Sequence, residues 1–139
     1  MERCFNMFSL IIGFVGGIFS FCFGGFDLLV DTLIVMTILD YITGVLKACL
    51  SKTLSSSIGF KGIIKKVMIY TVVVCAVMLD KLMGGQLPLR EVVITFFIAN
   101  EGVSLLENVS PYLPIPEQLK DVLLQLRDKN GGDDNDSDK

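Results

Sequence analysis

The chain has 139 residues, of which 52% are hydrophobic and 19% charged, and its formal net charge is −3. This length suggests a single domain. Histidine is absent, which removes the usual general base and the commonest metal ligand, and so argues against an enzyme or a metal site. No basic patch with interleaved aromatic residues indicates a nucleic-acid partner, and we expect no cofactor. We expect the four cysteines to pack between helices rather than to form disulfides or bind a metal; they are Cys4, Cys22, Cys49 and Cys75.

Residues 4–26 form the first expected transmembrane helix. The stretch contains no charged residue, and a helix of that length spans roughly 34 Å, enough to cross the hydrocarbon core of a bilayer. A cleaved signal peptide fits less well, because Glu2 and Arg3 make the preceding segment nearly neutral and no small-residue cleavage site follows. The sequence therefore predicts an all-α integral membrane protein of helical hairpins, with three to four transmembrane helices and a short amphipathic C-terminal helix.

Small residues recur along this first helix with a spacing of four residues. Gly13 pairs with Gly17 in this way, and Gly16, Ser20 and Gly24 repeat the spacing. Small residues at that interval let helix backbones approach closely in a membrane. We interpret them as a helix-association face, although glycine is also common in membrane helices for other reasons. A tight turn is expected over residues 24–27.

The second expected helix covers residues 28–50 and carries a polar stripe. On a helical projection, Lys47 and several small polar residues fall within about 60° of Asp40. The rest of the helix is apolar. Asp40 and Lys47 lie two turns apart on the stripe, so they could pair with each other.

A lysine-rich connector, residues 47–66, links the second helix to the third. Its lysines are Lys47, Lys52, Lys61, Lys65 and Lys66, and it has no acidic residue. Short lysine-rich loops stay in the cytoplasm, which places this loop inside the cell and, with the first two helices as a hairpin, the N-terminus as well. Serines 55–57 and Gly59 indicate an irregular stretch, so the third transmembrane helix is expected at 63–83.

The fourth expected helix, residues 91–109, begins apolar and then turns polar. Its polar side chains occupy one arc of about 120° on a helical projection. They are Asn100, Glu101, Ser104, Glu107 and Asn108. A length of about 19 residues allows the segment to span the membrane, and an interfacial helix lying flat is the alternative. The four segments together form a transmembrane domain over residues 1–110.

Residues 111–139 form a C-terminal region with a different composition. Pro116 suits the first position of a helix and Glu117 its first turn. Apolar residues follow at the spacing of one helix face, at Leu119, Val122, Leu123 and Leu126, which predicts a short amphipathic helix. The acidic tip, residues 133–139, is too polar to bury surface and is expected to be disordered.

The two polar faces need an explanation, because a charge near the centre of a membrane helix costs roughly 2.5–3.5 kcal/mol. The faces can meet one another, the same face of a neighbouring subunit, or water. Asp40 and Glu101 therefore either hold a small bundle together or, with the other polar residues of both faces, line an aqueous lesion. The second interpretation requires a homo-oligomer, since a chain with at most four helices can hardly enclose a wide channel alone.

Four segments together are similar to a known family. They are LDYITGVLKA (39–48), SSSIGFKGIIKKV (55–67), FFIANEGVSLLENV (96–109) and PIPEQLKDVLLQL (114–126). In this order they resemble the toxin secretion/phage lysis holin family of Gram-positive phages and prophages, over nearly the whole chain from Leu28 to Arg127. The first helix and the acidic tip carry no such resemblance, and many tails in the family are strongly basic where this one ends acidic.

The resemblance implies a multi-pass protein of the host bacterial cytoplasmic (inner) membrane that oligomerises among the lipids and opens lesions at a set time. Such lesions let a cell-wall hydrolase, the endolysin, reach the peptidoglycan. Relatives encoded beside clostridial toxin genes are linked to toxin release, and an antiholin would be a further partner. The residues by themselves also allow a non-lytic ion channel or transporter, or a membrane anchor that recruits a cytoplasmic partner.

Overall fold

The computed structural model describes residues 2–131, and all of its regular structure is α-helical. The helices are α1 (Glu2–Phe23), α2 (Leu28–Leu50), α3 (Ser56–Leu82), α4 (Leu89–Val109) and α5 (Glu117–Gly131). The all-α fold class is thereby confirmed. The disorder expected of the acidic tip concerns residues outside the described part of the chain.

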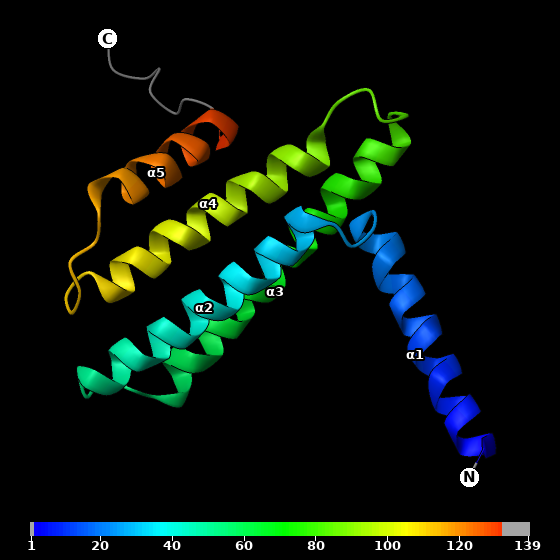
Figure 1. Ribbon diagram of the computed structural model, residues 1–139, viewed down its shortest axis with the longest axis horizontal. Coiled ribbons are helices and arrows are strands. Elements are labelled where there is room, and N and C mark those ends of the chain that lie inside the picture. The colour runs from blue at the N-terminus through cyan, green and yellow to red at the C-terminus, as the bar shows by residue number, and fades with distance from the viewer. Residues whose placement is uncertain (1, 132–139) are drawn as a thin grey trace.

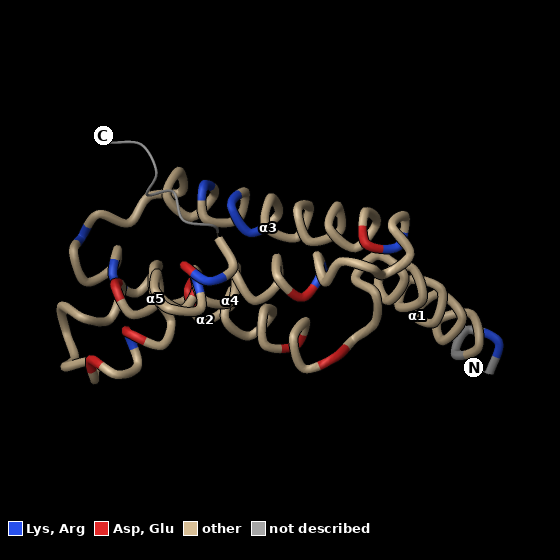
Figure 2. The backbone as a smooth tube through the Cα atoms, turned by 90° about the horizontal axis from the view of Figure 1, so that it is seen from above, with Lys and Arg blue, Asp and Glu red and all other residues tan. Residues whose placement is uncertain are grey.

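Four of these helices, α1 to α4, are long and apolar enough to cross a membrane. The described residues therefore contain four candidate spans, the upper end of the expected three to four, and the crossing of the membrane by α4 stays a prediction. Figure 2 shows the reason, because long stretches of α1 and α3 carry no charged residue. The α5 helix is the short amphipathic helix expected near the C-terminus.

The α3 helix begins earlier than its sequence suggests. Ser55 is its N-cap, and the Ser55 side chain accepts a hydrogen bond from the backbone N–H of Ile58 at 3.3 Å. A capping serine satisfies one of the N–H groups that a helix start leaves without a partner. The irregular stretch expected near Ser55 and Gly59 is therefore wrong, and the helix starts at Ser56 rather than at residue 63.

The helices pack around α4, which lies between α2 and α3 on one side and α5 on the other (Figure 1). The core includes Val30 and Leu33 of α2, Val73 of α3 and Ile94 of α4, all of which are almost completely buried. The α1 helix projects away from this bundle, and only 6% of its apolar stretch is buried. An apolar helix without a covering neighbour belongs in lipid or against another protein surface.

Large exposed apolar side chains are unevenly distributed over the helices. They are frequent on α1, α2 and α3, whereas in the described chain none lies on α4 and only Leu119 and Val122 lie on α5. Among the cysteines with described side chains, Cys49 and Cys75 are also exposed, so they do not pack between helices of this chain as expected; Cys22 is half-buried. The side of the bundle formed by α1 to α3 thus suits contact with lipid.

The α5 helix is docked closely along α4. Gly102 of α4 makes this approach possible, because a Cβ atom there would lie 2.9 Å from both Leu123 Cδ2 of α5 and Met36 Cε of α2. At the far end of α5, a Cβ on Gly131 would lie 2.8 Å from the Phe96 ring. Leu123 is buried in this contact. The two helices therefore run side by side over most of the length of α5 (Figure 1).

Cations from two other helices hold the C-terminal end of α1. Arg90 Nε donates to the Phe23 carbonyl at 2.7 Å, and Lys81 Nζ donates to the Phe21 carbonyl at 2.6 Å. Positive charges are favourable at a helix C-terminus, where carbonyl groups lack partners and the helix dipole is negative. No basic residue of α1 itself lies in its last turn, so α3 and α4 supply the charge.

Arg90 also fixes the turn between α1 and α2. Its Nη1 lies 2.9 Å from Asp27 Oδ2, and Asp27 in turn caps α2 through the Val30 N–H. Gly24 and Gly25 adopt φ values of +73° and +108° in this turn, a region that favours glycine. Gly24 therefore lies beyond the end of the helix, against Arg90, and does not extend the stripe of Gly16 and Ser20.

Arg90→Gln should loosen the α1–α2 turn and lower the free energy of unfolding by about 1–3 kcal/mol, because buried acceptors lose a charged donor. Unfolding in mixed detergent micelles measures this. The control is Arg127→Gln, since Arg127 pairs with the adjacent Asp128 on the surface, and its loss should cost less than about 1 kcal/mol. Equal effects of the two substitutions would contradict the role of Arg90.

The same contact gives a pH dependence with a definite sign. The hydrogen bond from Arg90 lowers the pKa of the Asp27 carboxyl below its ordinary value of 3.8. A carboxyl with a lowered pKa stabilises the folded chain fully above its ordinary value, and this stabilisation is lost as the pH falls through the folded value. Part of the acid sensitivity of wild-type protein below pH 3.8 should therefore be absent from Arg90→Gln.

Candidate functional site: a charged cluster between three helices

A lysine of α3 joins the two acidic residues that the sequence places in the membrane. Lys66 Nζ donates to Asp40 Oδ2 of α2 and to Glu101 Oε2 of α4. The side chains of Lys66, Asp40 and Glu101 are only 14%, 9% and 0% exposed. We call these three residues the charged cluster. It ties α2, α3 and α4 together at one point inside the bundle.

Lys65 completes the charge balance of this cluster. Its Nζ lies 3.3 Å from Glu101 Oε1, while its side chain remains 49% exposed. The contact is an ion pair that lacks hydrogen-bond geometry. Glu101 Oε1 is therefore buried without a hydrogen-bond partner within residues 2–131. Two carboxylates thus face two ammonium groups. This neutrality matters, since an uncompensated charge would make a buried ion pair far more costly.

The remaining polar residues extend the contact between α2 and α4. Asn108 Nδ2 lies 3.2 Å from Asp40 Oδ1 and 3.3 Å from Thr43 Oγ1, and donates to both oxygens. Lys47 Nζ donates to the backbone carbonyl of Glu107 at 3.3 Å. The polar faces of the two helices therefore meet each other, which was one of the arrangements open from the sequence. The alternative pairing of Asp40 with Lys47 is wrong, because Asp40 pairs with Lys66.

A crevice of about 310 Å³ reaches the charged cluster from the surface. Its polar walls include Lys65, Lys66, Ser104 and Asn108, while Tyr41 packs beside the α3 backbone at Gly62. A crevice of this size, with polar side chains along part of its wall, has room for several water molecules. Water at this place would solvate the half-exposed Lys65 and the outer edge of the cluster.

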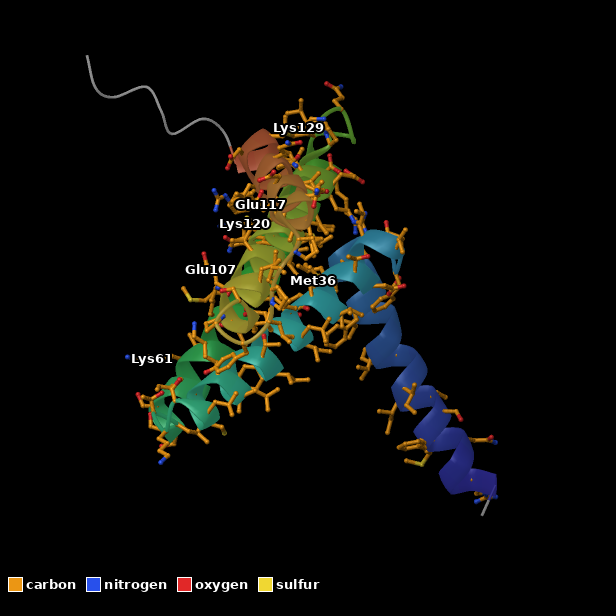
Figure 3. All side chains as sticks on the ribbon, turned by 60° about the vertical axis from the view of Figure 1, so that its left-hand side comes forward. Met36, Lys61, Glu107, Glu117, Lys120 and Lys129 are labelled. Atoms are coloured by element: carbon orange, nitrogen blue, oxygen red, sulfur yellow. The ribbon has the colours of Figure 1, made fainter. Side chains whose placement is uncertain are left out.

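Other predicted site residues lie apart from the cluster. Asn100 is half-buried on α4 and Glu107 is exposed. Lys52 and Lys61 are exposed, and Lys61 extends away from the bundle (Figure 3). On α1, Ser20 is half-buried, and a Cβ atom on Gly13, Gly16 or Gly17 would meet nothing within 4 Å. The roles of these residues in lining or association stay predictions.

Two functional contacts were missed by the sequence reasoning. Lys66 was assigned to a cytoplasmic loop, but α3 includes it and its charge is buried between helices. Two intramembrane carboxylates without an assigned cation were the available signal. Arg90 was not singled out, although a cation in the first turn of a helix opposes the helix dipole and so indicates a partner elsewhere.

Lys66→Met should strongly destabilise the chain, because it leaves two carboxylates without their shared cation. Removing one partner of a buried pair costs about 3–5 kcal/mol. Unfolding of purified protein in mixed micelles measures the loss. Lys65→Met is the matched control and should cost less than about 1 kcal/mol, since Lys65 is half-exposed.

The triple variant Asp40→Asn, Lys66→Met and Glu101→Gln should recover most of this stability, because no buried charge remains. A triple variant as unstable as Lys66→Met alone would show that the cation contributes by shape rather than by charge.

Comparison with known proteins agrees with this architecture. Residues 17–128 match the Bacteriophage holin family. An uncharacterized protein of Clostridium perfringens (strain 13 / Type A) is 45% identical over 94% of this chain and 98% of its own. One from Listeria monocytogenes serovar 1/2a is 42% identical over 93% of this chain and 92% of its own. A protein of Bacillus phage phi105, named "Probable holin", is 35% identical over 72% of this chain and 75% of its own.

No solved structure matches the chain. Within residues 2–131, no group of three or more Cys, Asp or Glu side chains is placed to hold a metal ion. The family match spans most of the chain, including all of α2 to α4. The resemblance noted in the four sequence segments is thereby confirmed. The chain belongs to the Bacteriophage holin family, a family of non-enzymatic proteins of the cytoplasmic membrane.

Proposed function

We propose that this holin oligomerises in the cytoplasmic membrane and opens lesions through which an endolysin, or a toxin, leaves the cell. The observation that carries the proposal is a charged cluster buried in a four-span chain of a holin family. Charges are retained inside membrane helices where function needs them, because their insertion is costly.

The proposed topology places the N-terminus, the segment between α2 and α3, and the turn between α4 and α5 on the cytoplasmic side. Lys52 and Lys61 are exposed near that segment, which suits the cytoplasmic side. The contact of Arg90 with Asp27 supports the arrangement, because it brings the α1–α2 turn and the start of α4 to the same end of the bundle. In a chain of four antiparallel spans, the α1–α2 turn and the start of α4 lie on the same side of the membrane, as this contact requires.

Association through α1 would supply the oligomer. The Gly13, Gly16 and Gly17 positions are open in the described chain, and α1 stands clear of the bundle (Figure 1). In lipid, helices associate through close backbone packing at small residues rather than through a hydrophobic driving force. An open glycine face on a projecting helix therefore suits contact with a neighbouring subunit.

Glu101→Gln should slow lysis, and Glu101→Leu should abolish it, because both weaken the contact that holds α4 in the assembled wall. The assay is co-expression with an endolysin that lacks a secretion signal, with culture turbidity as the readout. Both variants should still insert into the membrane, since removing a charge from α4 lowers the insertion cost. The positive charge left unbalanced at Lys66 should lower the stability of the folded chain.

Leu105→Ala, on the other side of α4, is the control and should have a modest effect on lysis. Lysis by Glu101→Leu on the wild-type schedule would remove the cluster from the opening mechanism. A wild-type chain that conducts ions but never releases the endolysin would favour the non-lytic channel instead.

Replacement of Gly13 and Gly17 by leucine should delay or prevent lysis while membrane insertion continues, because the larger side chains keep α1 helices apart. Cross-linking of membranes, followed by gel electrophoresis, measures the oligomers directly. The control replaces Leu10 and Phe14 of the same helix by alanine. An unchanged lysis time at equal protein level would show that these glycines have no role in association.

A further inference from the structure

We propose that α5, docked on α4, forms the water-facing surface of the lesion wall. This inference rests on the proposed function, the opening of a lesion. The starting observation is the position of α5 along α4. Gly131 lies against Phe96, which precedes the end of α4 at Val109 by 13 residues (109 − 96). At about 1.5 Å per residue this is roughly 20 Å, past the middle of a hydrocarbon core of about 30 Å. Docked α5 therefore lies at membrane depth whenever α4 spans the membrane.

The outer face of α5 is unsuited to lipid at that depth. Its charged residues are Glu117, Lys120, Asp121, Arg127, Asp128 and Lys129. All of them except the partly exposed Arg127 are exposed, and Figure 3 labels three of them on α5. Arg127 hydrogen-bonds Asp128 on the same helix. Exposed charges inside a bilayer require water beside them.

The opposite side of the molecule has the reverse character. Exposed large apolar side chains cover α1, α2 and α3, while α4 is enclosed between these helices and α5. With α5 docked, exposed apolar side chains therefore lie on α1 to α3 and exposed charged side chains on α5, which lies on the other side of α4 (Figure 1). Several copies placed side by side would present lipid-facing sides outward and α5 helices inward, around water.

The docking contact is specific enough to hold α5 in such a wall. Leu123 is buried against Val103 and Leu106 of α4, and Gly102 leaves no room for a larger side chain at the crossing point. The polar face of α4 is already occupied by α2 and α3 through the charged cluster. The crevice beside Lys65 admits water only at the edge of the cluster, whereas α5 carries exposed charged residues along its whole length.

The mixed charge of this surface predicts weak ion selectivity. Three acidic and three basic residues are present on α5, so neither cations nor anions are favoured, and size should decide passage. Rings of one charge sign make pores selective. Reversing the two exposed lysines therefore gives a sharp test.

Purified protein in liposomes that contain a cationic and an anionic dye provides the measurement. At an ionic strength of about 0.01 M, where charge acts over about 30 Å, Lys120→Glu with Lys129→Glu should raise the ratio of cationic to anionic dye released by at least about threefold. The matched control reverses Lys52 and Lys61, which are exposed after α2 and on α3 rather than on α5, and should leave the ratio near that of wild type. No shift with the α5 pair, or an equal shift with the control pair, overturns the inference.

A covalent lock tests whether α5 stays on α4 during release. In a chain with all four cysteines replaced by alanine, a short reagent that forms a disulfide with each thiol bridges Phe96→Cys and Gly131→Cys and joins α5 to α4. The same reagent bridges the matched glycine–aromatic pair, Tyr41→Cys with Gly62→Cys, and joins α2 to α3 at a similar contact. We expect both cross-linked proteins to release dye without loss. A loss confined to the α4–α5 lock and restored by a reductant overturns the inference, because α5 would then have to leave α4.

These arms separate this inference from the function on which it rests. If the wild-type chain releases neither dye, the proposal that it opens lesions is wrong, and the proposed role of α5 is wrong as well. Release by the wild-type chain, combined with failure of either α5 arm, overturns the role of α5 alone.

Discussion

The placement of Lys66 between Asp40 and Glu101 is the interaction on which the rest of the structure depends. It brings α2, α3 and α4 to one point and brings opposite charges together in a region that would otherwise reject them. Without it, α4 would carry an isolated carboxylate on a helix that is already the least apolar of the four candidate spans. The cluster therefore makes α4 compatible with a membrane by enclosing it, rather than by making it hydrophobic.

Because α4 is enclosed, the exposed surface of the chain divides into a part that suits lipid and a part that suits water. Lipid suits the exposed surfaces of α1 to α3, and water suits the exposed surface of α5. A soluble protein arranges this division radially, with its apolar residues inside. Here the division runs across the molecule, from one side to the other. Such an arrangement is stable only where both solvents are present, at a membrane surface or along the wall of a water-filled opening.

The attachment of α1 shows a second use of charge in this chain. Arg90 and Lys81 satisfy the carbonyl groups at the end of α1, and Asp27 balances Arg90. These contacts hold only the last turn, so the rest of the helix remains open to lipid or to a neighbouring subunit. A helix fixed at one end and uncovered along its length has the freedom that association between copies requires.

The sequence by itself determined the features that depend on neighbouring residues. Predominantly apolar segments predicted the helices, and the bounds of α2 match the expected 28–50. The period of 3.6 residues placed Asp40 and Glu101 on polar faces. Helix length and amphipathicity are local properties, so a single sequence carries them. The Ser55 cap was also local, and its position could have predicted the early start of α3.

Only the tertiary structure decided the partners. Lys66 lies 26 residues from Asp40 and 35 from Glu101 along the chain, and the rotation of α3 selects Lys66 rather than Lys65 for burial. The same holds for Arg90, whose acceptors are the Phe23 carbonyl at the end of α1 and Asp27 in the turn that follows, 67 and 63 residues away along the chain. Which side of α4 meets α5 likewise follows from the close approach at Gly102. Periodicity identifies a face, but the partner of that face depends on how whole helices pack, because side-chain contacts between helices are set by their relative rotation and depth.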